Sequence, residues 1–357
     1  MTLHKPRRAT SQDVARHARV SRALVSGVLN GTMSTMRVSP TTRQRVLLAA
    51  TELGYSPNPL ARALQQQRSN VIGYVPRSSR RTPYEHPVPF ILGLHIARAA
   101  MRRQLHVVEA SAETAEARKS DELVRFMRER RVDGVILDSP ESAAEVQRFI
   151  DDGLPVIQLI RPRSDVDSPT VVVDADPGIS EALRHLIELG HRNIAFIGHG
   201  GAHPVDRARL DCFTSNLHAR GLPVRTDWLR LVADYDIAAG NTAMSALLAL
   251  PEDRPTALLA TGDNLAVGVL QALYAADVRV PRDLSLISYD DIFAAHLAPP
   301  LTSVAQPLEE VAERALALLT AALESTPDAG AGSAIVSLPT RLIVRDSTRS
   351  PSRRQEG

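Results

Sequence analysis

The stretch SQDVARHARVSRALVSGVLN, residues 11–30, carries the side chain with the clearest chemistry in the chain. Arg22 has a planar guanidinium that can donate two parallel hydrogen bonds to the edge of a guanine, or can bind a phosphate. Both roles stay open at this point. Either role requires that Arg22 lie near the exposed start of a helix.

Other side chains suggest no enzymatic chemistry. The glycine-rich run GHGGAH, residues 198–203, has neither the lysine and hydroxyl residue of a phosphate-binding loop nor the spacing of a dinucleotide fingerprint. Neither a GxSxG elbow nor an HExxH pair occurs in the sequence. The single cysteine, Cys212, excludes an internal disulfide and a multi-cysteine metal site. We therefore expect no catalysis, no cofactor and no metal.

Short helices are predicted around Arg22. Thr10 to Asp13 form a capping box, and Val14, Ala15 and Ala18 give the helix that follows an apolar face. Ser21 can cap a second helix with Val25, Val28 and Leu29 at helical spacing, which ends at Asn30-Gly31. A third helix follows Ser39-Pro40, is lined by Val46, Leu47 and Leu53, and ends at Gly54. Such short helices must share one core.

Helix, tight turn, helix and supporting helix form a helix-turn-helix unit, whose second helix enters the DNA major groove. Capping hydroxyls leave helix N-termini able to hold phosphates. Within the predicted domain of residues 1–57, we expect DNA contacts from Thr10, Ser21, Arg22, Ala23, Ser26, Gly27 and Asn30.

The charge distribution supports this interpretation. Residues 1–60 contain nine basic residues and two acidic ones, a net charge of +7, which leaves −5 for the rest of a chain whose total is +2. A basic segment joined to an acidic body is typical of a nucleic-acid-binding module. After Gly54, Asn58 and Pro59 begin a helix too short to persist alone, so it is either a linker or a segment that folds on binding.

From residue 71, short Val-, Ile- and Leu-rich strands such as DGVIL and NIAFIGH alternate with amphipathic stretches such as ISEALRHLIELG. This alternation predicts parallel sheets covered by helices on both faces. The length suggests two doubly wound lobes, with ligands bound at the carboxyl ends of the strands. The predicted fold is therefore an all-α helix-turn-helix head followed by a two-lobed α/β body.

The head resembles the DNA-binding domain of the LacI/GalR family of bacterial transcription regulators. The resemblance rests on DVARHARVSRALVSGVLN and TRQRVLLAATELGYSPNPLARAL, within residues 10–64. It implies that Asn58–Leu64 is a hinge helix that becomes ordered on operator DNA, with Leu64 as a wedge in the minor groove. The chain departs from the family at Arg19, where the turn usually has glycine, and at Gly27, where an arginine is common.

The body resembles the same family, whose effector domain is similar to a periplasmic sugar-binding protein. The motifs are RRVDGVIL, ELGHRNIAFIG, GDNLAVG, VPRDLSLISYDD, APPLTSVAQP and LPTRLIVRDST. The effector-binding residues that the resemblance implies are Asp138, Arg209, Phe213 and Asp290. An arginine with a carboxylate suits a polyol, and the arginine alone suits an acid.

Two positions depart from the family's ligand pattern. Gly262 stands where asparagine is usual, and Ile160 where aspartate is common, so both losses reduce sugar-binding polarity. In the basic loop PRSSRRTPYEHPVPF, the side chains of Arg77, Tyr84 and His86 are interpreted as solvated in preference to lining the pocket. An acidic or phosphorylated effector therefore remains an alternative to a neutral sugar.

The predicted organisation has four parts. Residues 1–57 form the DNA-binding domain, 58–69 the hinge helix and linker, 70–345 the effector domain and 346–357 a disordered tail. Within the effector domain, lobe 1 covers about 70–166 and 303–325, and lobe 2 about 167–302 and 326–345.

The predicted function is that of a regulator, a repressor by type, that acts as a homodimer on double-stranded operator DNA. A small molecule, a sugar or related metabolite, controls its operator affinity. No apolar run is long enough to cross a membrane, so we expect a cytoplasmic protein without a membrane partner. The alternative is a cytoplasmic small-molecule-binding protein with no role on DNA.

Overall fold

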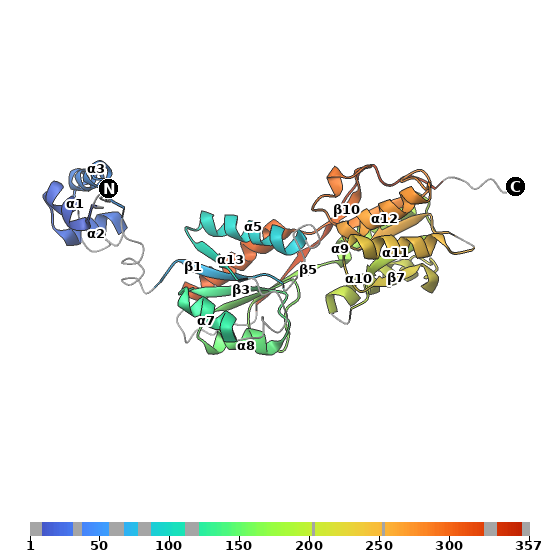
Figure 1. The fold of residues 1–357 in the computed structure, drawn as a ribbon, viewed down its shortest axis with the longest axis horizontal. Helices are drawn as coiled ribbons and strands as arrows, with labels where there is room; N and C mark the ends of the chain where they lie inside the picture. Colours follow the sequence, from blue (N-terminus) through green and yellow to red (C-terminus); the bar gives the residue numbers. More distant parts are fainter. Residues whose placement is uncertain are drawn as a thin grey trace, which may run out of the picture. The chain divides into compact units, whose positions relative to one another are not determined.

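The computed structural model describes residues 9–30, 38–56, 68–77, 87–110, 121–201, 204–251, 254–324 and 334–351. The chain divides into two compact units, Met1–Asn70 and Val71–Gly357 (Figure 1). Each unit has its own hydrophobic core, as expected of separate domains. No helix in these ranges is both long and apolar enough to span a membrane.

The described residues of the first unit form three helices: α1 (Ser11–His17), α2 (Arg22–Asn30) and α3 (Pro40–Glu52). Together they enclose one core, made of Val14, Ala15, Ala18, Val25, Val28, Val46, Ala49 and Ala50. Each helix is too short to be stable alone, so this shared core holds all three in place. The prediction that Leu47 lines the core is wrong. Its side chain is 46% exposed, because α3 turns the face of Val46, Ala49 and Ala50 inward.

The predicted helix starts are confirmed. Thr10 and Asp13 form a reciprocal capping box, in which the Thr10 N–H donates to the Asp13 carboxylate (2.9 Å) and the Asp13 N–H donates to Thr10 Oγ1 (3.3 Å). Ser21 Oγ accepts from the N–H of Leu24 (3.2 Å). Between the two helices Arg19 has φ = 51°, a left-handed conformation that costs a non-glycine residue about 1–2 kcal/mol.

The second unit contains two six-stranded sheets. The first sheet has the order β11-β5-β4-β3-β1-β2, and all its neighbouring strands are parallel. Its strands are β1 (Val71–Val75), β2 (His106–Glu109), β3 (Gly134–Asp138), β4 (Val156–Leu159), β5 (Thr170–Asp174) and β11 (Ile335–Pro339).

The second sheet has the order β12-β10-β9-β8-β6-β7, parallel except for the pair β10 and β12. Its strands are β6 (Ile194–His199), β7 (Leu229–Val232), β8 (Ala257–Ala260), β9 (Ser285–Asp290), β10 (Thr302–Ala305) and β12 (Arg341–Ile343). We call the sheets with their covering helices lobe 1 and lobe 2. The predicted doubly wound architecture is thus confirmed.

Helices cover both faces of each sheet. In lobe 1, α5 (Pro87–Arg102) and α13 (Leu308–Glu324) cover one face, and α7 (Asp121–Glu129) and α8 (Ala143–Asp151) the other (Figure 1). Successive side chains of β3 point to opposite faces of the sheet and so contribute to both cores. Ile136 packs under α5 and α13, while Val135 and Leu137 pack under α7 and α8.

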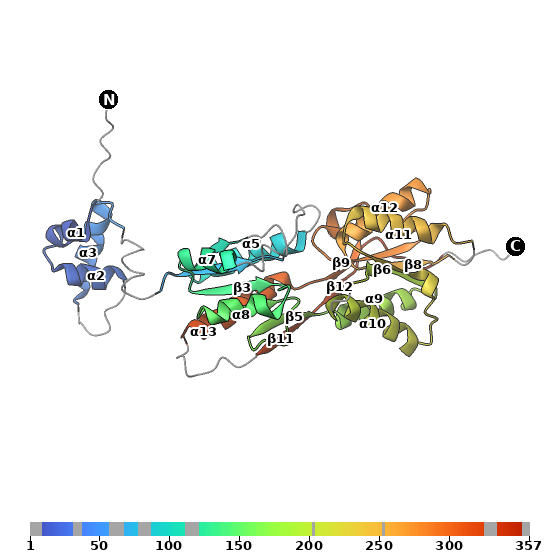
Figure 2. The same cartoon turned by 60° about the horizontal axis from the view of Figure 1, so that its bottom comes forward.

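In lobe 2, two helix pairs enclose the sheet in the same way. The pairs are α9 (Asp176–Glu188) with α10 (Pro204–Ala219), and α11 (Ile237–Leu248) with α12 (Asp263–Ala275), seen on opposite faces in Figure 2. Two short 3₁₀ helices, η1 (Thr226–Trp228) and η2 (Ala294–His296), complete the lobe. The close contact of α11 with α12 depends on Gly240 and Gly268, where an added Cβ would lie 2.2 and 2.0 Å from backbone oxygens of the other helix.

The chain crosses between the lobes three times, and each crossing differs from the predicted boundary. The first crossing follows β5, so residues 170–174 belong to lobe 1 and not to lobe 2. The second follows β10, which pairs with β9 in lobe 2. The third lies between β11 and β12, because β11 pairs with β5 as an edge strand of lobe 1. Long-range strand pairing decides these boundaries.

The predicted disordered tail is wrong for its first six residues. Ser347 is fully buried and bridges two strands, since its Oγ donates to the Leu286 carbonyl (2.5 Å) and accepts from the Thr302 N–H (2.8 Å). The carbonyl of Arg349 lies 2.8 Å from Nε2 of the buried His191. Residues 346–351 thus form part of lobe 2, and residues 352–357 lie outside the described ranges.

Candidate nucleic-acid interface and ligand-binding cleft

The exposed surface of the first unit gathers the starts of α1 and α2. Ser21, Arg22 and Ala23 are exposed and Ser26 is partly exposed. Arg22 Nε donates to Ser11 Oγ (3.0 Å), so the first turns of α1 and α2 are adjacent. The first turn of α2 contains no acidic residue that would neutralise its positive end. Polyanions are the natural ligands of such a surface.

Gly27 differs from the other described residues that were predicted to contact DNA. Gly27 is buried beside Val25 and Val28, which contradicts its prediction as a base-contacting position. The side chain of Asn30 and the hinge residues Asn58 and Leu64 lie outside what the structure describes. Thr10 is exposed, but its hydroxyl is engaged in the capping box, so it contributes through the helix end that it holds.

A cleft in the second unit is lined by both lobes. From lobe 1 come Arg77, which follows β1, Asp138 and Ser139 at the end of β3, and Ile160 and Arg161 after β4. All follow the carboxyl ends of parallel strands, the edge at which doubly wound sheets bind ligands. The first turn of α5 closes one side of the cleft with Pro87, Val88 and Pro89.

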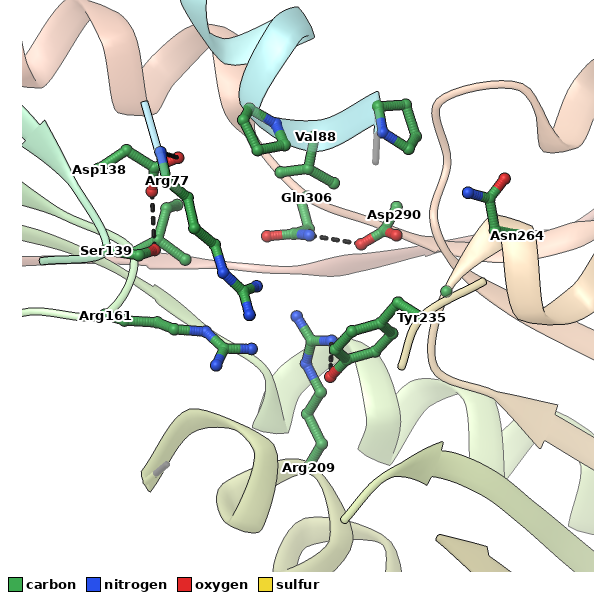
Figure 3. Close-up of a pocket in the computed structure, with 14 residues that line it drawn as sticks. Arg77, Val88, Asp138, Ser139, Arg161, Arg209, Tyr235, Asn264, Asp290 and Gln306 are labelled. Atoms are coloured by element: carbon green, nitrogen blue, oxygen red, sulfur yellow. Dashed lines mark hydrogen bonds between the residues drawn. The ribbon is translucent and has the colours of Figure 1, made fainter. Parts of the chain in front are cut away.

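Lobe 2 contributes residues from the matching ends of its own strands and from α10. They are Arg209, Tyr235, Gly262, Asn264, Asp290 and Gln306. Figure 3 shows the side chains of Arg77, Arg161 and Arg209 pointing toward one another from different segments. Gly262 leaves space that Tyr235 borders, since a Cβ there would lie 3.3 Å from the Tyr235 ring.

Arg209 is held by aromatic rings and oxygens. Its guanidinium lies 4.1 Å from the ring centroid of Tyr289 and donates hydrogen bonds to Tyr235 Oη (3.2 Å) and the Thr261 carbonyl (3.3 Å). The side chain is 7% exposed. Contact with the ring faces offsets part of the desolvation of a buried cation. Arg209 is therefore a fixed positive charge on the lobe 2 side of the cleft.

Two acidic residues line the same cleft. Asp138 accepts from Ser139 Oγ (2.8 Å), and Asp290 accepts from Gln306 Nε2 (2.5 Å). Burial raises the pKa of Asp290, although Arg209 and Gln306 favour its charged form. Beneath it, burial and the charge of Asp290 raise the pKa of Asp263 to about 6. Carboxylates in such positions accept hydrogen bonds from ligand hydroxyls.

The backbone is strained where it enters the cleft. Ser139, Ile160 and Asp290 have φ values of 49°, 61° and 95°, which non-glycine residues rarely adopt. At Ile160 a three-residue turn is closed by a hydrogen bond from the Arg161 N–H to the Leu159 carbonyl (2.6 Å). Strain of this kind persists where a functional site needs a side chain in a fixed direction.

The structure places three of the four predicted effector-binding residues, Asp138, Arg209 and Asp290, in one cleft. Phe213 is a correction. It is fully buried in the core of lobe 2, with its ring centroid 5.0 Å from that of Phe196, and it does not line the cleft. Arg77 lines the cleft, contrary to its interpretation as a solvated loop residue, whereas Tyr84 and His86 fall in a range left undescribed.

Several lining residues were missed by sequence reasoning, namely Ser139, Arg161, Tyr235, Asn264 and Gln306. Each lies within a few residues of a strand's carboxyl end, and that position is the signal that could have found them. Over the described ranges, no group of three or more His, Cys, Asp or Glu side chains is arranged to hold a metal ion.

A helix-turn-helix domain joined to a two-lobed α/β body with an interlobe cleft defines a ligand-binding transcription regulator. The bacterial regulatory proteins of the lacI family match residues 10–58, and the periplasmic binding protein-like domain matches residues 183–348. Catabolite control protein A of Priestia megaterium is 31% identical over 344 residues, which cover 95% of this chain and 99% of that protein. The chain belongs to the LacI family of bacterial transcription regulators.

Two solved structures share this architecture. The complex of the transcriptional regulator CelR with cellobiose is 30% identical, with a TM-score of 0.68, and covers 95% of this chain and 100% of its own. The Lac repressor dimer bound to operator and the anti-inducer ONPF is 25% identical, with a TM-score of 0.75, and covers 96% of this chain and 100% of its own.

Proposed function

We propose that this chain is a homodimeric repressor that binds operator DNA through its first unit and changes its operator affinity when a small molecule occupies the interlobe cleft. The observation that carries the proposal is the presence, in one chain, of the exposed, acid-free start of α2 and a cleft lined by polar side chains of both lobes. Such a regulator catalyses no reaction and works in the cytoplasm, where the DNA is.

On DNA, α2 lies in the major groove with Arg22 and Ser26 toward the base edges. The N-termini of α1 and α2, capped by Thr10 and Ser21, bind phosphates on either side. The proposal includes the hinge role of Leu64 that the family resemblance implies. A dimer of such units reads a pseudo-palindromic site, because its two-fold symmetry places two α2 helices on equivalent half-sites.

Dimer formation is supported by the surface of α5. Phe90, Leu94 and Met101 are large apolar residues, 43%, 45% and 74% exposed, on one helix of lobe 1. Their spacing brings them toward one side of the helix, and a second copy that covered them would remove apolar surface from water. The Lac repressor, which shares the fold, is a dimer in its operator complex.

The small molecule acts by binding one arrangement of the two lobes more tightly than the other, because equal affinity for both would change nothing on DNA. The proposal is tested by mapping the genomic fragments that the full-length protein binds and measuring affinity for them with and without small molecules. We expect affinity to fall steeply with salt as phosphate counterions are released. Binding of a ligand with no binding to any duplex would favour the alternative, a binding protein with no role on DNA.

A further inference from the structure

The cleft contains more positive charge than a neutral sugar requires. The guanidinium groups of Arg77, Arg161 and Arg209 extend from three different segments toward one region of the cleft (Figure 3). Two carboxylates, Asp138 and Asp290, line the same space, so the charged side chains among the described lining residues sum to +1. Raising the pKa of Asp290 by burial makes its negative charge harder to maintain and increases that excess.

Two of these arginines are buried. Arg161 and Arg209 are each 7% exposed, and they belong to opposite lobes. Guanidinium groups that face one another repel, and the low dielectric of a closed cleft strengthens the repulsion. An anionic group between them converts the repulsion into charge-assisted hydrogen bonds, for which the planar fork of arginine is well suited.

The backbone just before Arg161 indicates that the direction of the Arg161 side chain is important. The turn centred on Ile160, with φ = 61°, puts a β-branched residue in the left-handed region immediately before Arg161. Such a conformation is strongly disfavoured for isoleucine. The turn directs the side chain of Arg161 into the cleft. Backbone strain of this kind persists where function depends on the direction of a side chain.

We infer that the ligand of this cleft is a polyhydroxylated compound with one carboxylate or phosphate group, which binds between Arg77, Arg161 and Arg209. Its hydroxyl groups face Asp290 and Asn264, on the lobe 2 side of the same cleft. The inference rests on the proposed ligand-controlled function and specifies the chemistry of the ligand. Since Arg77 and Arg161 belong to lobe 1 and Arg209 to lobe 2, the anionic group also draws the lobes together.

The test uses full-length protein and four probes at equal ionic strength: glucose, glucuronate, glucose 6-phosphate and inorganic phosphate. Thermal unfolding and calorimetric titration measure binding, and DNA affinity is measured on the same samples. The variants are Arg161→Gln and Arg77→Gln. Arg163→Gln is the matched control, because Arg163 lies two residues from Arg161, is paired with Asp165 (3.6 Å) and does not line the cleft.

We expect inorganic phosphate and at least one of the two anionic sugars to stabilise the protein more than glucose does. The Arg161→Gln and Arg77→Gln variants should bind these anions at least tenfold more weakly, and Arg163→Gln should bind like the parent. The response to glucuronate against glucose 6-phosphate distinguishes a carboxylate from a phosphate.

Three outcomes would overturn the inference: glucose binds as tightly as its charged counterparts, anion binding survives Arg161→Gln, or none of the four probes binds. In each case unchanged operator binding would leave the proposed function standing. If Arg161→Gln loses anion binding but the parent protein binds no duplex, the anion site is supported and the proposed role on DNA is rejected.

Discussion

The guanidinium of Arg209 lies 4.1 Å from the ring centroid of Tyr289, and this pair joins α10 to β9 at the floor of the cleft. A desolvated cation over an aromatic face is stabilised by about 2 kcal/mol. We expect a double-mutant cycle of Arg209→Met and Tyr289→Leu to give a coupling free energy of about 1–2 kcal/mol in urea unfolding. Tyr289→Phe, which keeps the ring face, should retain most of the coupling. Additive effects would mean that the stacking contributes nothing.

Arg22 tests the orientation of the first unit on DNA. Its Arg22→Ala variant should bind the operator about tenfold or more weakly, because a base-edge or phosphate contact of arginine is worth roughly 1–3 kcal/mol. Fluorescence anisotropy with a labelled operator measures the loss. Arg45→Ala, an exposed arginine on α3, is the matched control and should lose less affinity. Equal losses in the two variants would show that only total charge matters.

Leu64 can be tested without reference to its position in the structure. If the segment that contains it acts as the wedge that the family resemblance implies, Leu64→Ala should weaken operator binding while ligand affinity stays unchanged. Titration with ligand and with labelled operator on the same preparation separates the two effects. Parental DNA affinity in this variant would reject the hinge role.

Asp263 gives the protein a predictable dependence on pH. Its pKa is raised to about 6, chiefly by burial, so the folded state holds this proton more tightly than the unfolded state does. The stabilisation from protonation is present below about pH 4 and is lost as pH rises through about 6, a change of about 3 kcal/mol. The expected result is that the parent loses unfolding free energy over this range relative to Asp263→Asn.

The asparagine variant suits this comparison because it preserves the local contacts. Asp263 accepts from Ser288 Oγ (2.7 Å) and from the N–H groups of Ile292 (2.8 Å) and Phe293 (3.0 Å). An amide oxygen can accept from both N–H groups while its NH₂ donates to Ser288 Oγ, which donates to Ser303 Oγ (2.8 Å). Parallel pH profiles for parent and variant would contradict the raised pKa.

The glycine contact between α11 and α12 predicts a large loss of stability. In Gly268→Ala the new Cβ would lie 2.0 Å from the Ile237 carbonyl oxygen, so one helix must move. We expect a loss of about 3 kcal/mol or more, which exceeds the gain of about 1 kcal/mol from the better helix propensity of alanine. Gln271→Ala, on the exposed side of α12, is the control and should be neutral. Thermal unfolding distinguishes the two.

Ser347 allows a test of how much the C-terminal segment, residues 346–351, contributes to stability. Removing its hydroxyl leaves the buried Leu286 carbonyl and Thr302 N–H without this partner, at a cost of about 1–3 kcal/mol for each buried polar group. Ser347→Ala should therefore lower the unfolding midpoint, and Ser350→Ala, an exposed neighbour, should not. Equal midpoints would show that the segment adds nothing to lobe 2.

Sequence alone was most informative where structure is set by neighbouring residues. The capping box of Thr10 and Asp13 and the cap at Ser21 were predictable because each joins groups three residues apart. The doubly wound body was predictable because alternating strand and helix patterns admit few arrangements. The face of α3 was misassigned at Leu47, since adjacent apolar residues occupy different sides of a helix.

Features that depend on long-range pairing were not predictable in this way. No local signal says that β11 pairs with β5, or that the polar segment around Ser347 packs between strands. Arg161 was missed because its direction depends on the strained turn at Ile160. Phe213 was wrongly placed in the cleft. It lies one helical turn from Arg209, but its ring packs on Phe196 in the core.

Gln306 occupies a special place among the residues of the cleft. It follows β10 on the second of the three segments that join the lobes, and its amide donates to Asp290 at the end of β9. Bending of that connector would therefore move the amide, and a ligand hydrogen-bonded to Asp290 would compete with it. Under the proposed function, Gln306 would couple ligand binding directly to the movement of the lobes, because it lies on a connector and bonds to a residue of the cleft.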